Sequence, residues 1–328
     1  MILLPTLRRA IHPFYDVVAL GQLTAFIRRR RFDLVHTHSS KAGLLGRWAA
    51  HLAATPVIVH TIHGFGFHPF QPAPLRMAFQ HLERATARIT DALIAVSAHD
   101  RDLGLRLGIG RPAQYRLIRY GIEAAQVAPN GVRAAVREAL GLNGGPVIGT
   151  VACLKPQKAP LEFVRACARI REHIPQARFL LVGHGALRQR VEREAAQLGL
   201  GDSLHLLGWR TDVPRLLQAM DVFVLTSRWE GLPIACLEAM AAGLPVVATR
   251  AGGLPELLPS EEHGMLVPIG QPERVADGVV ALLRDPARRA RMGRCNQEAV
   301  NGRFRVEEMV AQTQQLYEEL LKEAKPRW

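Results

Sequence analysis

Two glutamates and a predicted helix start occupy one short stretch of the sequence. Glu230 and Glu238 are separated by GLPIACL, and Gly243 follows shortly after. Pro233 suits the first turn of a helix, Gly243 suits the left-handed position beyond its end, and most residues between them are good helix formers. The N-terminus of such a helix offers unpaired N–H groups and a partial positive charge, which suit a phosphate. The adjacent carboxylates therefore predict a ligand with phosphate and hydroxyl groups, such as a nucleotide sugar.

Two apolar strands flank this stretch and must position it. VFVLT at 222–226 and LPVVAT at 244–249 are short and β-rich, as strands buried on both faces are. Strands and helices alternate along the rest of the chain. Strands are expected in FDLVHTH, VIVHTI, DALIAVS, PVIGTV, ARFLLVG and SLHLLG, and helices at 14–31, 160–173 and 305–324, among others. The pattern predicts an α/β protein with parallel sheets, whose ligands collect at the carboxyl ends of the strands.

Length and a local change in composition predict two domains. At 328 residues and 48% hydrophobic, the chain can bury a large core. Residues 128–145 have the proline and glycine content of an exposed connection with a short helix. We therefore expect an N-terminal domain at 1–127, a linker at 128–145, a second domain at 146–304 and a C-terminal helical segment at 305–328.

The composition argues against membrane-spanning and disulfide-rich classes. No apolar run approaches the roughly 20 residues that cross a bilayer, and the opening MILLPTLRR is too short for a signal-peptide core. The expected compartment is the cytoplasm. Cys153, Cys167, Cys236 and Cys295 show no C-x-x-C spacing, so free thiols are expected rather than a disulfide or a zinc site.

Positive charge is concentrated in the first part of the chain. The formal net charge is +13, and residues 1–127 hold 16 Lys and Arg against 7 Asp and Glu. Such an excess attracts nucleic acid, anionic lipid or phosphorylated substrates, or reflects arginine used as a general surface residue. Nucleic acid is not expected as a partner, because no binding motif is visible and aromatic residues are only 6% of the chain.

The sequence EGLPIACLEAMAAGLPVVAT, followed by RAGGLPELL, resembles the signature of family 4 glycosyltransferases, and the resemblance extends from about Gly208 to Val267. It implies the GT-B fold, in which two doubly wound, Rossmann-like domains face each other across a cleft and a final helix crosses back to the first. Family members usually begin with a strand and a glycine-rich loop, whereas LPTLRRAIHPFYD resembles family sequence downstream of that loop. We therefore expect the first domain to be incomplete.

The resemblance also implies roles for individual residues of the opening stretch. Glu230 would hold hydroxyl groups of the donor sugar, and Glu238 would accept hydrogen bonds from the ribose hydroxyls. The segment formed by Gly231, Leu232 and Pro233 would bring backbone N–H groups to the donor diphosphate.

Other motifs of the family supply further candidates. Lys158 in GTVACLKPQKAP aligns with the lysine that contacts the donor diphosphate, and His63 in HTIHGFGFH resembles the active-site histidine near the transferred sugar. Cys153 stands where the family usually has an arginine. The sequence leaves open whether Lys155, Arg228 or neither replaces that charge.

Three more residues resemble parts of the family's nucleotide site. Gly183 in LVGHGALR lets the backbone come close to the ligand side, and Trp209 and Arg210 in LGWRTD follow a strand where members hold the base. The histidines at 36, 38, 60, 63 and 68 also allow a metal cluster by spacing alone. Because no cysteine or carboxylate joins them at a familiar spacing, a metal cluster is not expected. The resemblance likewise implies a reaction that requires no metal and no other cofactor.

Taken with the resemblance, these residues predict a retaining glycosyltransferase of cell-surface glycan synthesis. The donor would be a UDP- or GDP-sugar, and the acceptor a polysaccharide or a lipid-diphosphate-linked sugar. The basic first half agrees with peripheral attachment to an anionic inner membrane face. Two alternatives stay open: a non-catalytic or impaired module that binds nucleotide sugars or membranes, and a sugar-nucleotide 2-epimerase of the same fold.

Overall fold

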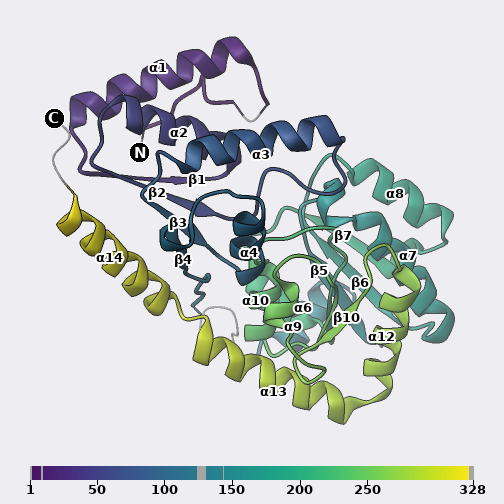
Figure 1. Cartoon of the computed structure of the whole chain (residues 1–328). Helices are drawn as coiled ribbons and strands as arrows, with labels where there is room; N and C mark the ends of the chain where they lie inside the picture. The colour runs from purple at the N-terminus through teal and green to yellow at the C-terminus, as the bar shows by residue number, and fades with distance from the viewer. Residues whose placement is uncertain (1, 9, 124–130, 143, 325–328) are drawn as a thin grey trace. The chain divides into compact units, whose positions relative to one another are not determined.

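The computed structural model describes residues 2–8, 10–123, 131–142 and 144–324, and the chain divides into two compact units (Figure 1). The first unit comprises Met1–Arg119 and Glu307–Trp328, and the second comprises Tyr120–Val306. Both are α/β units with parallel sheets, as the alternating pattern predicted. Among the residues that the structure describes, no helix is long and apolar enough to cross a membrane.

The sheet of the first unit has its strands in chain order. The strands are β1 (Leu34–His38), β2 (Val57–Ile62), β3 (Ala92–Ala95) and β4 (Tyr115–Leu117), and their order is β1-β2-β3-β4. The helices are α1 (Pro13–Arg30), α2 (Ser40–Leu52), α3 (Ala73–Ala87), α4 (Ala98–Arg106) and α14 (Val306–Glu323), with a 3₁₀ turn, η1, at Pro112–Gln114. Because all strands are parallel, the loops after β1 and β2 leave the same edge of the sheet.

Alternating strand residues divide the core of the first unit between two faces. Val57 and Val59 pack with Leu316 of α14 on one face, whereas Ile58 packs with Ile27 of α1 and residues of α2 on the other. Figure 1 shows α14 on the side of this sheet opposite α1 and α2. The helix predicted at 305–324 thus packs on the first sheet, to which it is not adjacent in sequence.

Two glycines bring α2 unusually close to the strands. A Cβ at Gly43 would lie 2.4 Å from Cε1 of His60, and a Cβ at Gly46 would lie 2.9 Å from Cγ2 of Thr37. Larger residues at these positions would push α2 away from the sheet. Gly43 and Gly46, which two leucines separate, therefore allow the first turns of α2 to pack directly against β1 and β2.

The second unit is a doubly wound sheet. Its strands are β5 (Val147–Val151), β6 (Arg178–Val182), β7 (Leu204–Gly208), β8 (Val222–Leu225), β9 (Val246–Thr249) and β10 (Met265–Val267). Their order is β10-β9-β8-β5-β6-β7. The chain first adds β6 and β7 on one side of β5 and then adds β8, β9 and β10 on the other. The order of the strands therefore reverses between β5 and β8, and this place is the topological switch point of the sheet. A ligand is expected there, at the carboxyl ends of these two strands.

Helices cover the second sheet on both faces, with η2 (Pro156–Lys158) and η3 (Gly201–Ser203) as short 3₁₀ turns. The helices are α6 (Arg133–Ala139), α7 (Pro160–His173), α8 (Arg188–Gln197), α9 (Val213–Ala219), α10 (Ile234–Ala241), α11 (Leu254–Leu257), α12 (Pro272–Arg284) and α13 (Pro286–Arg303). Ile148, Phe179 and Val224 lie in a core that α7 completes with Phe163.

Most predicted elements have the expected type. Helix α7 occupies 160–173 as predicted, and Gly243 has the expected left-handed backbone, with φ of 72°. Helix α10 begins at Ile234 rather than at Pro233, which is the preceding extended residue. Residues 272–284 and 286–303, for which the sequence patterns above predict no element, form α12 and α13. Of the range expected to be a linker, residues 133–139 form α6, and 128–130 and 143 lie outside the described residues.

Candidate active site

The switch point of the second unit brings Lys158 and Glu230 together. Lys158 ends η2 in the loop after β5, and Glu230 lies in the loop after β8. The Nζ atom of Lys158 lies 2.5 Å from Oε1 of Glu230, and only 17% and 5% of these two side chains are exposed. The structure thus joins two predicted site residues in a largely buried ion pair.

Neighbouring polar groups hold both ends of this pair. Nε2 of Gln157 donates to the backbone oxygen of Trp229 at 2.9 Å and approaches Oε2 of Glu230 at 3.5 Å. Oγ1 of Thr226 donates to the backbone oxygen of Lys158 at 3.1 Å. The loops after β5 and β8 are therefore cross-linked. Sequence reasoning missed Gln157 and Thr226, although Gln157 directly precedes Lys158.

Gly252 and Gly253 pack directly against the backbone of the Glu230 loop. Gly252 has φ of 52°, and a Cβ there would lie only 1.8 Å from the backbone oxygen of Glu230. The N–H of Gly253 donates to the backbone oxygen of Gly231 at 2.9 Å. Only glycine allows so close an approach with that backbone geometry. The RAGGLP segment therefore determines where the Glu230 loop lies.

Glu238 lies on α10, the helix that follows this loop. Gly231, Leu232 and Pro233, which lead into the helix, are buried. Burial raises the pKa of the Glu238 carboxyl. Within the described residues no hydrogen bond or ion pair engages that carboxyl, so it can accept hydrogen bonds from ligand hydroxyl groups.

Cys153 and Gly183 lie together at the adjacent loop. A Cβ at Gly183, whose φ is 140°, would lie 2.0 Å from the backbone oxygen of Ala152, so this glycine lets two loops approach each other. The N–H of Leu154 donates to the backbone oxygen of His184 at 3.1 Å. Between these contacts Cys153 is an exposed free thiol. The loop after β5 thus has a thiol at the position that the resemblance associates with a positive charge.

The other predicted residues of the second unit have different environments. Trp209 is 81% exposed, and the guanidinium of Arg210 pairs with Asp212 of the same loop at 2.6 Å. Nη2 of Arg228, one of the two alternatives for the missing charge, lies 3.1 Å from Oε1 of the buried Glu162. The structure therefore gathers Lys158, Glu230 and the 231–233 segment at the switch point, whereas Arg210 is held at its own loop.

His63 belongs to the first unit and pairs with another histidine. It follows β2, and His38 ends β1, the parallel neighbour of β2. Nδ1 of His38 lies 2.9 Å from Nε2 of His63, and the two rings stack with centroids 5.1 Å apart. Partial burial, and secondly the charge on His38, lower the pKa of His63 to about 4. Burial also lowers the pKa of His38, so both imidazoles are neutral at pH 7.

The remaining histidines of the first sheet form structural hydrogen bonds. Nε2 of His36 lies 2.7 Å from Oγ1 of Thr61, and its Nδ1 contacts the hydroxyl of Tyr317 on α14. Nδ1 of His60 lies 2.9 Å from Oγ1 of Thr37. In the part of the chain that the structure describes, no three His, Cys, Asp or Glu side chains are grouped so that they could hold a metal ion.

Comparisons with known families identify both parts of the chain. Residues 132–299 match the family described as "Glycosyl transferases group 1", and residues 2–121 match the "Glycosyl transferase 4-like domain". The chain is 35% identical over 318 residues to the UDP-Gal:alpha-D-GlcNAc-diphosphoundecaprenol alpha-1,3-galactosyltransferase of Escherichia coli, covering 95% of this chain and 82% of that protein. It is 26% identical over 325 residues to the N-acetyl-alpha-D-glucosaminyl L-malate synthase of Bacillus anthracis, covering 96% and 82%.

A solved structure supports the same fold. The Anabaena protein HepE, in complex with UDP and glucose, superimposes with a TM-score of 0.84 at 23% identity, covering 95% of this chain and 84% of HepE. The resemblance stated from the sequence and the predicted GT-B fold class are thereby confirmed. The chain belongs to the glycosyl transferases group 1 family and is a glycosyltransferase with the GT-B fold.

Proposed function

We propose that this enzyme transfers a sugar from a UDP-sugar, with retention of anomeric configuration, to a lipid-diphosphate-linked sugar in cell-surface glycan synthesis. The observation that carries the proposal is the contact between Lys158 and Glu230 at the switch point of β5 and β8. It places a cation and a carboxylate where doubly wound sheets bind nucleotides. The name of the Escherichia coli relative supports the UDP donor and the lipid-linked acceptor for this chain.

Lys158 is suited to follow the charge that develops on the leaving diphosphate. An ammonium group has three donors, of which one faces Glu230, so two can turn to phosphate oxygens. N–H groups from Gly231 into α10 would add fixed dipoles to the same site. Groups that are already in position stabilise transition-state charge most effectively.

The two glutamates would bind the two sugar parts of the donor, the ribose and the transferred sugar. Glu238, with its unengaged carboxyl on α10, would accept hydrogen bonds from the ribose hydroxyls. Glu230, whose backbone packs against Gly252, would accept hydrogen bonds from the transferred sugar. Trp209 and Arg210 would lie toward the base, and Gly183 and Cys153 toward the diphosphate. In this proposal His63, neutral and supported by His38, donates or accepts a hydrogen bond near the reacting sugar.

The first unit would meet the acceptor at an anionic membrane surface. Helix α1 ends in exposed arginines at 28, 29 and 30, and the same unit holds most of the excess positive charge. Each basic residue near such a surface contributes about 1 kcal/mol of attraction, which salt weakens. We propose peripheral attachment at the cytoplasmic face on this basis.

The decisive experiment combines donor binding with transfer. UDP, GDP and their sugars are compared in a thermal-shift panel, because stabilisation follows affinity by mass action. The best donor is then incubated with a GlcNAc-diphosphate lipid, and the anomeric configuration of the product is determined by NMR. We expect UDP-sugars to stabilise the protein and Glu230→Gln to abolish transfer in EDTA-treated buffer. Glu172→Gln, an exposed glutamate on α7, is the control. Inversion of configuration or full activity of Glu230→Gln would refute the proposal.

A further inference from the structure

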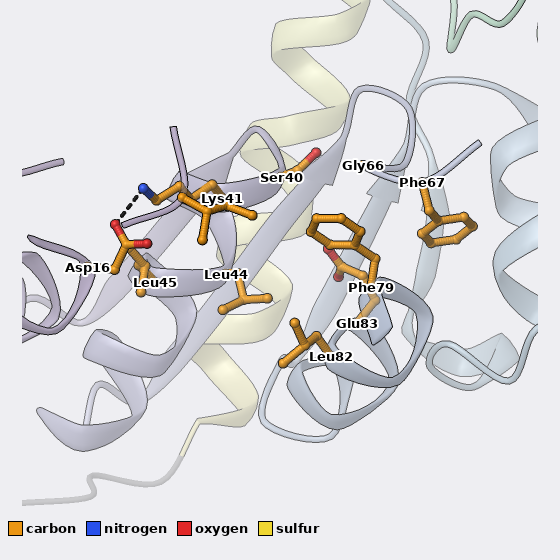
Figure 2. Close-up of a pocket in the computed structure, with 11 residues that line it drawn as sticks. Asp16, Ser40, Lys41, Leu44, Leu45, Gly66, Phe67, Phe79, Leu82 and Glu83 are labelled. Carbon is orange, nitrogen blue, oxygen red and sulfur yellow. Dashed lines mark ion pairs between the residues drawn. The ribbon is translucent and has the colours of Figure 1, made fainter. Parts of the chain in front are cut away.

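A largely apolar cavity of about 170 Å³ lies in the first unit, beside the beginning of α2 and the middle of α3. Figure 2 shows Leu44 of α2 and Phe79 and Leu82 of α3 around the same space. The apolar lining residues are Ile11, Leu44, Leu45, Phe67, Phe79 and Leu82. A cavity of roughly 150 Å³ with Leu, Ile and Phe walls accepts a benzene-sized molecule. This cavity therefore suits a branched hydrocarbon of about five carbons.

The charged residues at the cavity are already engaged within the protein. Nζ of Lys41 pairs with Asp16 (Figure 2). It also donates to the backbone oxygens of Arg8 and Ala10, so all three of its donors are used. The buried Glu83 pairs with Nη2 of Arg47 at 2.8 Å. A ligand that enters the cavity therefore meets hydrocarbon rather than free charge.

The cavity opens to the outside at two of its apolar residues. Ile11 is 65% exposed and Leu82 is 46% exposed, although both line the cavity. Other exposed apolar side chains lie on α1, which begins two residues after Ile11, and on α3: Phe14, Val17, Leu75 and Met77. Such exposure is costly in water and is consistent with a ligand that arrives from an apolar phase.

Four residues that line the cavity follow His38 and His63 closely in the chain. Ser40 and Lys41 follow His38 after a single residue, Ser39, whose φ of 66° turns the chain sharply. In the loop after β2, Gly66 and Phe67 follow His63 within four residues. A Cβ at Gly66 would lie 2.8 Å from Oγ of Ser40, so the two segments touch. One ligand can therefore reach the exposed imidazoles with a polar group and the cavity with an apolar one.

We propose that this cavity holds the hydrocarbon next to the diphosphate of the acceptor lipid, about one isoprene unit in length. The inference rests on the proposed function, since it specifies how the first unit selects a lipid-linked acceptor over a free sugar. The cavity, its paired charged residues and its junction with His38 and His63 all belong to the first unit, whereas Lys158, Glu230 and Glu238 belong to the second.

Two diphosphate esters that differ only in their hydrocarbon test this inference. Binding of methyl diphosphate and dimethylallyl diphosphate is measured by calorimetry, with UDP present in excess to occupy the donor site. We expect dimethylallyl diphosphate to bind about tenfold more tightly, which corresponds to about 1.4 kcal/mol. Equal affinity for the two esters would overturn the inference.

Leu82→Glu and Leu75→Glu form a matched pair of variants. Both leucines lie on α3 and are similarly exposed, at 46% and 45%, but only Leu82 lines the cavity. We expect Leu82→Glu to abolish the preference for the dimethylallyl ester and Leu75→Glu to retain it. The ratio of the two affinities cancels any repulsion between the new carboxylate and the diphosphate. Equal loss of preference in both variants would refute a defined cavity site.

Two further readouts separate the possible failures. UDP binding, measured by thermal shift on each variant, shows whether the protein is folded and tests the proposed donor site by itself. Phosphatidylglycerol vesicles are added as competitors to the dimethylallyl ester. If they displace it from the wild type, the bound hydrocarbon lies on the surface that contacts the membrane rather than inside the cavity, and the inference is wrong. Persistent binding in their presence supports it.

Discussion

The ammonium nitrogen of Lys158 lies 2.5 Å from a carboxylate oxygen of Glu230, a residue 72 positions further along the chain. Strand order explains this contact, because β5 and β8 are neighbours in the sheet although β6 and β7 separate them in sequence. Both side chains are largely buried, so each depends on the other for charge compensation. The pair is therefore both part of the proposed donor site and part of what holds its two loops together.

Removing one partner of this pair should destabilise the second unit. Lys158→Met leaves the Glu230 carboxylate buried without its cation, and we expect a loss of about 2–4 kcal/mol in the free energy of unfolding. The double variant Lys158→Met/Glu230→Gln should recover a large part of that loss. Urea denaturation of the single and double variants measures this.

The exposed pair between Arg188 and Glu192 provides the control. Its atoms lie 2.8 Å apart on the surface of α8, and its removal should cost no more than about 0.5 kcal/mol. If removing either pair lowered the free energy of unfolding by a similar amount, the burial of Lys158 and Glu230 would not explain the effect.

The kinetic effects of Lys158 and Glu238 should differ. If Lys158 stabilises the leaving diphosphate mainly in the transition state, Lys158→Ala lowers kcat at least about 100-fold. If Glu238 holds the ribose in both ground and transition states, Glu238→Ala raises the donor KM about tenfold and leaves kcat nearly unchanged. Initial rates over a range of donor concentrations separate these outcomes, and an unchanged KM in Glu238→Ala would contradict its assignment.

Sequence patterns predicted the local features of this site better than its contacts. Helix formers and Gly243 indicated α10, because those signals lie within a few residues of the helix. The pairing of Lys158 with Glu230 depends on strand order, which no local pattern specifies. For the same reason Gln157 and Thr226 were missed. Gly252 lies in the RAGGLPELL motif, but its approach to Glu230 arises from tertiary packing, which the motif alone does not reveal.

The histidine contacts of the first unit likewise could not be predicted from local sequence patterns. The motif HTIHGFGFH singled out His63 through resemblance, but its partner His38 belongs to another motif on the neighbouring strand. The register of β1 and β2 brings these two strand ends together. Similarly, the contact between His36 and Tyr317 requires α14 to pack on a sheet formed at the other end of the sequence.

Gly252 should tolerate alanine much less than Gly270 does. Both glycines have positive φ, 52° and 80°, so alanine is strained at either position. At Gly270 a Cβ meets nothing within 4 Å, and we expect a cost of about 1 kcal/mol. At Gly252 the Cβ would collide with the backbone of Glu230, so the loop must move. Gly252→Ala should therefore also weaken UDP-sugar binding, as measured by calorimetry. Unchanged donor affinity in this variant would show that Gly252 does not position Glu230.

Acid should destabilise the first unit through its neutral histidines. Burial, and secondly the charges of neighbouring histidines, lower the pKa of His36 to about 4, and the pKa of His63 is lowered to about 4 as well. The unfolded chain, in which histidine has its ordinary pKa of about 6.5, binds more protons than the folded chain between these values. Stability is therefore fully present above pH 6.5 and falls as the pH drops from 6.5 to 4. Replacing His36 with Asn should flatten this dependence in urea titrations at pH 4.5–7.5, whereas His173→Asn, at an exposed position of the second unit, should not. An identical pH dependence in wild type and His36→Asn would exclude His36 as a source of the effect.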